Sequence, residues 1–130
     1  MKPLPSSTSD ADLLGFIDGW AALMEREDYE GAFAYTDHTP EQGWSPFLLR
    51  EIVKAYGDAR PDQKVTLAGV PSDVSQRKEV TRWRENPLGE LGEIWYDLNI
   101  DGVASDLTAT FAIICDSEGI LIRLNDIHVM

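Results

Sequence analysis

The second half of the chain alternates apolar and polar residues, a period of two that is typical of β-strands with one buried face. Two such runs flank Asp101-Gly102. Asp-Gly between alternating runs is a strong hairpin signal, because both central residues of the turn take positive φ. A third run from Ile120 to Met130 follows a turn over residues 116–119. The pattern therefore predicts three long antiparallel strands over residues 90–130.

The first half has apolar residues spaced by three and four, which is typical of helices with one buried stripe. A first helix is expected to begin at Ser9 or Asp10, and a short second helix to begin at Asp28. A third is expected between Ser45-Pro46 and Gly57, since Ser caps, Pro fits the first turn and Gly ends helices. Two weaker strands are predicted at residues 64–70 and 78–85.

Helices followed by antiparallel strands define an α+β domain. We expect three N-terminal helices packed on a strongly curved antiparallel sheet of about five strands. At 130 residues the chain is long enough for one domain with its own core. Residues 1–9 hold two Pro, three Ser and one Thr and are expected to form a flexible arm, so the predicted domain spans residues 10–130.

The hairpin loops determine which side chains share a face of the sheet. The predicted pairs are Ile100 with Val103, Tyr96 with Leu107, Ile94 with Ala109, Cys115 with Ile120 and Phe111 with Leu124. The expected core face carries Ile94, Tyr96, Leu98, Val103, Leu107, Ala109, Phe111 and Ile113. The expected outer face carries Glu93, Trp95, Asp97, Asp106, Thr108 and Thr110.

The last strand leaves two alternatives open. Without interruption, its register puts Asp126, His128 and Met130 on the core face, where a carboxylate and an imidazole must be paired. They would then line a polar pocket together. Alternatively, a bulge near Asn125 turns Asp126 and His128 to solvent and Ile127 and Val129 inward.

The charge balance excludes some partners. Eleven basic side chains against 23 acidic ones give a net charge of −12, which repels phosphate backbones and anionic lipid surfaces. We therefore expect neither nucleic-acid nor membrane binding. No apolar run is long enough to cross a bilayer, and no signal-peptide pattern begins the chain, so a cytoplasmic location is expected. An acidic surface that binds a basic partner protein stays an alternative.

Few motifs carry chemistry. We expect neither a metal site nor a cofactor, because the two histidines are far apart and phosphate-loop and nucleophile-elbow motifs are absent. The single cysteine, Cys115, ends an apolar run and is expected to be a buried, inert thiol rather than a nucleophile. Four basic residues lie close together, and we expect them to pair with Glu90, Glu93 or Asp97 rather than to bind an anion: Arg77, Lys78, Arg82 and Arg84.

The order of elements supports a resemblance. The opening helix with residues 16–20 (Phe-Ile-Asp-Gly-Trp), the short helix at residues 28–33 (Asp-Tyr-Glu-Gly-Ala-Phe) and the long closing strands resemble the nuclear transport factor 2-like superfamily, also called cystatin-like α+β. The resemblance implies a cone-shaped sheet around the first helix. The superfamily includes ketosteroid isomerase-like enzymes, dehydratases, polyketide cyclases and non-catalytic binding modules, so the resemblance implies no single chemistry.

Two functions compete for the expected cavity between the first helix and the sheet. The first is binding of a small apolar ligand without catalysis, in a pocket lined by Trp20, Leu107, Ala109, Phe111 and Met130. The second is an isomerase or dehydratase in which Asp126 and His128 act as an acid–base pair and Tyr96 donates to a developing oxyanion.

The outer face suggests self-association. Trp83 and Trp95 are expected to pair across neighbouring strands, with Thr108 and Thr110 beside them, and such a face can form a homodimer interface. The alternative is that long Arg and Glu stems cover the two indoles within one chain.

Overall fold

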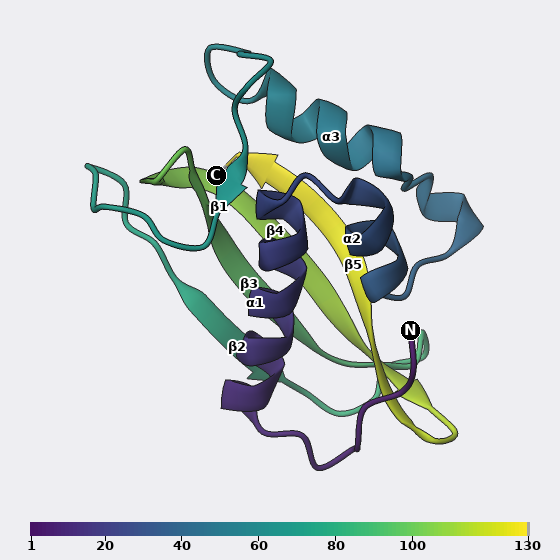
Figure 1. Cartoon of the computed structure of the whole chain (residues 1–130). Helices are drawn as coiled ribbons and strands as arrows, with labels where there is room; N and C mark the ends of the chain where they lie inside the picture. The colour runs from purple at the N-terminus through teal and green to yellow at the C-terminus, as the bar shows by residue number, and fades with distance from the viewer. Residues whose placement is uncertain (130) are drawn as a thin grey trace.

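A computed structural model of the chain describes residues 1–129, and its element order confirms the α+β class. Three α-helices and one 3-10 turn precede five strands (Figure 1): α1 (Asp10–Glu25), α2 (Tyr29–Tyr35), η1 (Pro40–Gln42), α3 (Pro46–Ala55), β1 (Val65–Thr66), β2 (Lys78–Arg82), β3 (Glu90–Ile100), β4 (Val103–Asp116) and β5 (Gly119–Val129). Within residues 1–129, no helix has the length and apolar character that crossing a membrane requires.

The three α-helices begin at the residues that the sequence predicts. Side-chain oxygens of Ser9, Asp28 and Ser45 each accept a hydrogen bond from a backbone N–H of the first turn, which satisfies one of the orphan donors there. Pro46 occupies the first helical position of α3, where its missing N–H costs nothing.

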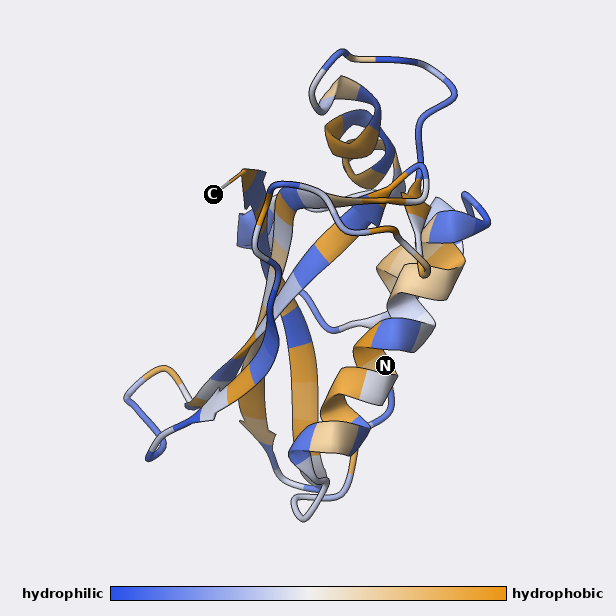
Figure 2. Ribbon diagram, turned by 90° about the vertical axis from the view of Figure 1, so that its left-hand side faces the viewer, coloured by the Kyte–Doolittle hydropathy of each residue, from blue (hydrophilic) through white to orange (hydrophobic). Residues whose placement is uncertain are grey.

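The strands form one antiparallel, unclosed sheet. β4 lies between β3 and β5, while the short β1 and β2 share the other edge of β3. The helices lie to one side of this twisted, bent sheet, so the sheet has an inner face toward the helices and an outer face away from them (Figure 2). The predicted strands at residues 64–70 and 78–85 are shorter than expected, at Val65–Thr66 and Lys78–Arg82.

The register of the main hairpin was predicted correctly only at its tip. Ile100 pairs with Val103 as expected, but farther along the strands Tyr96 pairs with Ala109 instead of Leu107. The reason is an irregularity in which three residues of β4, 105–107, lie opposite the single residue Leu98. Because the shift is two residues, each side chain keeps its predicted face.

The last strand contains a bulge at Asn125, the second of the two alternatives that the sequence left open. Phe111 pairs with Leu124, but Thr110 pairs with Asp126, which leaves Asn125 as the extra residue. Ile127 is therefore buried at 6% exposure. The bulge was also expected to turn Val129 inward, but Val129 is 58% exposed because it lies at the very end of β5. Asp126 and His128 stand on the outer face.

The core lies between the helices and the inner face. The fully buried side chains include Trp20 and Leu13 from α1, Leu49 from α3, and Phe111 from β4. Seven of the eight expected core positions are buried, at 0–2% exposure. The exception is Val103, which is 43% exposed because it lies at the tip of the hairpin.

Residues 1–9, expected to form a flexible arm, contact the start of β5. Leu4 and Ile120 exchange two backbone hydrogen bonds of 2.8 Å. Gly119 makes this approach possible, since it has φ +148° and a Cβ there would lie 2.0 Å from the Leu4 carbonyl oxygen.

Replacing Gly119 with Ala is expected to separate the arm from the sheet and to lower the free energy of unfolding by about 1–3 kcal/mol, as strain at a special backbone conformation does. Hydrogen exchange of the Leu4 and Ile120 amides measures the effect. Gly89→Ala is the control, because φ is +77° there and no atom lies within 4 Å of a Cβ. Equal Leu4 and Ile120 protection in the two variants would contradict the proposed clash.

A segment between β1 and β2, residues 67–77 and hereafter the strap, lies over the outer face. Asn99 Nδ2 donates to the Leu67 carbonyl at 2.9 Å, and Val70 forms a bridge with Val103 on β4. The Gln76 side chain then donates to the Leu98 and Ser105 carbonyls at the irregularity, at 2.9 and 3.0 Å. The strap therefore covers polar positions that face solvent in an ordinary two-layer domain.

Candidate functional site

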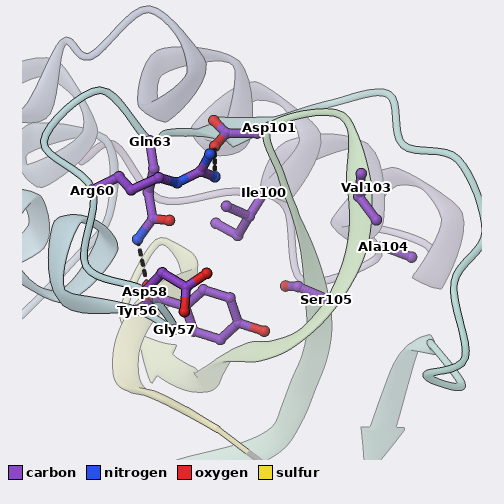
Figure 3. A pocket seen from close by; sticks show the side chains of 10 residues that line it. All are labelled: Tyr56, Gly57, Asp58, Arg60, Gln63, Ile100, Asp101, Val103, Ala104 and Ser105. Carbon is purple, nitrogen blue, oxygen red and sulfur yellow. Dashed lines mark hydrogen bonds and ion pairs between the residues drawn. The ribbon is translucent and has the colours of Figure 1, made fainter.

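A cavity of about 460 Å³ opens at the hairpin end of the sheet (Figure 3). One wall is the end of α3 with the loop that follows, and the other is the tip of the β3–β4 hairpin. The lining residues are Tyr56, Gly57, Asp58, Arg60 and Gln63 from the first wall, and Ile100, Asp101, Val103, Ala104 and Ser105 from the second.

The hydrogen bonds of two side chains, Asp101 and Gln63, hold the walls in place. Arg60 donates to Asp101 Oδ2 at 2.6 Å, and the backbone N–H of Lys64 donates to Asp101 Oδ1 at 3.0 Å. Gln63 is 2% exposed, and its Nε2 donates to the Val53 and Tyr56 carbonyls at 2.7 and 2.6 Å. The Gln63 side chain thus satisfies carbonyls at the end of α3 and fixes the loop against the helix.

A separate apolar hollow of about 310 Å³ shares one lining residue with this cavity. It is lined by Ile52, Ala55, Tyr56, Leu107, Ile127, His128 and Val129. Tyr56 lines both spaces, and its hydroxyl donates to Asp106 Oδ1 at 2.5 Å. Burial and then this hydrogen bond to Asp106 raise the pKa of Tyr56, so the phenol remains a neutral donor. We call the two spaces on either side of this shared residue, taken together, the Tyr56 cleft.

The expected catalytic trio does not form one site. Asp126 Oδ2 and His128 Nδ1 lie 3.0 Å apart on the outer face. Tyr96 points inward, where its hydroxyl donates to Asp18 Oδ1 of α1 at 2.5 Å. Because the sheet separates Tyr96 from the pair, the acid–base hypothesis with these three residues is wrong. The bulge at Asn125 causes the separation.

The raised pKa values of two core tyrosines predict that the protein loses stability at alkaline pH. Burial, followed by the neighbouring charge of Glu27, raises the pKa of Tyr29 to about 12 from 10.0. Burial, then the hydrogen bond to Asp18, also raises the pKa of Tyr96. A folded-state pKa above the unfolded value gives stability that is fully present below about pH 10 and lost as the pH rises through the folded value.

We therefore expect the free energy of unfolding to fall between pH 10 and 12, and to fall less in Tyr29→Phe than in the wild type. Urea unfolding at a series of pH values measures both slopes. The prediction fails if the two proteins lose stability in parallel.

The expected ligand pocket is filled by side chains. Trp20, Ala109 and Phe111 are 0% exposed and Leu107 is 2% exposed, and the Trp20 and Phe111 rings meet edge to face at 5.2 Å. These residues form the core between α1 and the sheet instead of lining a cavity there. Leu107 also lines the apolar hollow. Met130, the fifth expected pocket residue, lies outside the described residues.

The expected interface residues do not form an open apolar surface. Thr108 and Thr110 are buried within the chain, at 0% and 4% exposure. Trp95 lies opposite Glu79 of β2, whereas Trp83 lies beyond the end of that strand and donates to the Glu90 carbonyl. The two indoles are therefore not cross-strand neighbours.

Arg77 and Arg82 of the basic cluster form ion pairs with other acidic residues than those expected. Arg77 pairs with Glu79 at 3.0 Å, and Arg82 pairs with Asp10 of α1 at 2.8 Å. Arg77 contacts Asp97 through its backbone: its N–H donates to Asp97 Oδ2, and its carbonyl accepts from the Asp97 N–H. The β2–β3 register explains the difference, because Lys78 lies opposite Tyr96 and its ammonium stands 4.4 Å from the ring centroid.

Cys115 is exposed, so the expectation of a buried thiol is wrong. It lies near the end of β4, past the buried part of that strand. A hydrogen bond with Glu85 raises the pKa of the Cys115 thiol, which keeps the thiol protonated and poorly nucleophilic.

Sequence reasoning missed the loop residues of the Tyr56 cleft. Asp58, Arg60 and Gln63 follow the third helix in a stretch with no strand or helix period. Their polar character within a short loop is the only signal that the sequence offers, and it does not distinguish a site from an ordinary surface loop.

The structure thus defines an α+β domain with an amphipathic cleft at the open end of its sheet. The family model for DUF7668, a domain of unknown function, matches residues 21–130, and the chain belongs to that family. No curated protein and no solved structure matches the chain. The matched region includes the whole Tyr56 cleft and the strap.

Proposed function

We propose that this protein binds a small molecule in the Tyr56 cleft without catalysing a reaction. The observation that carries the proposal is that a polar cavity and an apolar hollow meet at one side chain, Tyr56. A concave site with an apolar wall and a few converging polar groups is the usual form of a small-molecule site.

The chemistry of the walls favours a ligand with an apolar body and a head that donates hydrogen bonds. Ile52, Leu107 and Ile127 offer the apolar wall. In the polar cavity, Asp58 and Asp101 bring carboxylate acceptors, and Arg60 is already paired with Asp101. A hydroxyl or amine head therefore fits better than a carboxylate or phosphate.

We further propose that the fold is the cone of the nuclear transport factor 2-like superfamily. Three helices precede the antiparallel sheet, and α1 packs across the inner face through Trp20. In this reading α3 caps the wide end of the cone, which is where the Tyr56 cleft lies.

The homodimer also stays a prediction, and sedimentation at micromolar concentration tests it.

The test is titration with N-phenyl-1-naphthylamine, a neutral apolar dye that carries one amine. We expect saturable binding to the wild type, and binding at least about tenfold weaker in Ala55→Phe, because the new ring fills the apolar hollow. Backbone amide shifts should map the dye to residues 52–63 and to the end of β5.

Ala34→Phe is the matched control, since both alanines are exposed helical residues and only Ala55 lines the hollow. Equal dye binding in the two variants, or shifts confined to other parts of the sheet, would rule out the Tyr56 cleft as the site.

A further inference from the structure

A second hollow, of about 290 Å³, lies on the outer face under the strap. Gln76 and Arg77 of the strap form one side, and Trp95, Asp97, Asp106 and Thr108 of the sheet form the other. The hollow therefore combines an indole ring, two carboxylates and one guanidinium.

Asp97 forms the buried acidic part of this hollow. The residue is 6% exposed. Its Oδ1 accepts hydrogen bonds from Trp95 Nε1 at 2.9 Å and from Thr108 Oγ1 at 2.6 Å, and its Oδ2 accepts one from the Arg77 backbone N–H at 2.7 Å. A carboxylate oxygen accepts about two hydrogen bonds, so Oδ2 retains capacity for another donor.

Asp106 adds a second acceptor. Its Oδ1 accepts the Tyr56 hydroxyl, while its Oδ2 accepts no hydrogen bond from residues 1–129. With two carboxylates in the hollow and a net charge of −12 on the chain, the local field favours a cation and opposes an anion.

The guanidinium of Arg77 already lies over the Trp95 ring. The Arg77 Cζ lies 4.0 Å from the ring centroid, a distance at which a cation is attracted to the π face. This guanidinium also forms an ion pair with Glu79, and both side chains of that pair are at least half exposed. Arg77 is thus held by weak surface contacts and can leave the ring at little cost.

We propose that this hollow is a binding site for a guanidinium group, and that Arg77 is an internal occupant that the ligand displaces. The incoming guanidinium stacks on Trp95 and donates to the free acceptor positions of Asp97 and Asp106. Its planar fork suits carboxylate oxygens beside an aromatic face. The site is separate from the Tyr56 cleft, so neither proposal depends on the other.

The test follows the Trp95 indole N–H signal by NMR while N-acetyl-arginine amide is added. Removing the competing side chain in Arg77→Ala is expected to tighten binding about three- to tenfold, the size of a partly exposed cation–π contact. Arg50→Ala is the matched control: this arginine has the same charge and a similar exposed pair with a neighbouring glutamate. It should bind the probe like the wild type.

Two further comparisons identify what is recognised. N-acetyl-citrulline amide has nearly the same shape without the charge and should not bind. Trp95→Leu should abolish binding, and in this variant the backbone amide signals of Asp97 and Thr108 replace the lost indole signal. Trp83→Leu, at an indole that is 41% exposed, should not. Binding of butylguanidinium as well as the amide supports a free guanidine as ligand, and binding of the amide alone supports an arginine within a peptide.

The proposal is overturned if Arg77→Ala binds no more tightly than Arg50→Ala, if the citrulline compound binds equally well, or if no guanidinium probe shifts the Trp95 signal.

Discussion

Trp20→Ala is expected to lower the free energy of unfolding by about 4 kcal/mol, the usual cost of truncating a fully buried tryptophan. Trp20 is 0% exposed at the centre of the contact between α1 and the sheet, and it packs edge to face against Phe111. Its loss leaves a void that the rigid β4 cannot fill. Urea unfolding followed by circular dichroism measures the change.

Two further variants test whether burial of the Trp20 ring causes this effect. Trp83→Ala should cost less than about 1 kcal/mol, since Trp83 is 41% exposed. Trp20→Phe should cost clearly less than Trp20→Ala, because Trp20 Nε1 has no hydrogen-bond partner among the described residues and its loss breaks no bond. A loss below 1 kcal/mol in Trp20→Ala would indicate that the space under α1 is loosely packed.

That result would also bear on function. A tightly packed interior would leave no room for a ligand under α1, which supports the proposal of the Tyr56 cleft as the ligand site. A loosely packed interior would return it to the space between α1 and the sheet, where the apolar pattern first suggested a pocket.

Much of the fold follows from local signals in the sequence. Asp101 and Gly102 both have positive φ, 51° and 78°, as the hairpin signal requires. Ser9, Asp28 and Ser45 cap the helices as expected. The alternation of apolar residues identifies the inner face correctly because a shift of two residues in register does not change the face of a side chain.

The parts that the sequence did not reveal depend on contacts between distant segments. The irregularity opposite Leu98 is stabilised by the Gln76 side chain, 22 residues away along the chain. The strap and the contact between Leu4 and Ile120 likewise have no periodic pattern. A position that alternation assigns to solvent, such as Thr108, is buried because the sheet and strap cover it.

The same limitation explains the outcome for the site residues. The sequence predicts Asp126 and His128 as a pair, and their side chains do lie 3.0 Å apart. Their face depended on whether a bulge occurs at Asn125, and single-sequence periodicity does not decide this. Asp97 was assigned to the outer face correctly, but its burial required the strap.

Asp97→Ala is expected to lower the free energy of unfolding by about 3 kcal/mol. The substitution removes the acceptor of three hydrogen bonds and leaves the Trp95 indole N–H, the Thr108 hydroxyl and the Arg77 backbone N–H without it. A buried donor without a partner costs about 1–3 kcal/mol. Part of that cost is offset because a buried charge is also removed. Urea unfolding measures the change.

Asp97→Asn should cost about half as much, because its single carbonyl oxygen still accepts about two of the three donors. Asp126→Ala, on β5 of the same sheet, is the control: its side chain is 57% exposed and pairs with His128, so its loss should cost less than about 1 kcal/mol. Equal losses in Asp97→Ala and Asp126→Ala would mean that desolvation of the Asp97 carboxylate cancels its hydrogen bonds. The strap would then be held to the outer face mainly by Gln76 and the backbone contacts of Val70.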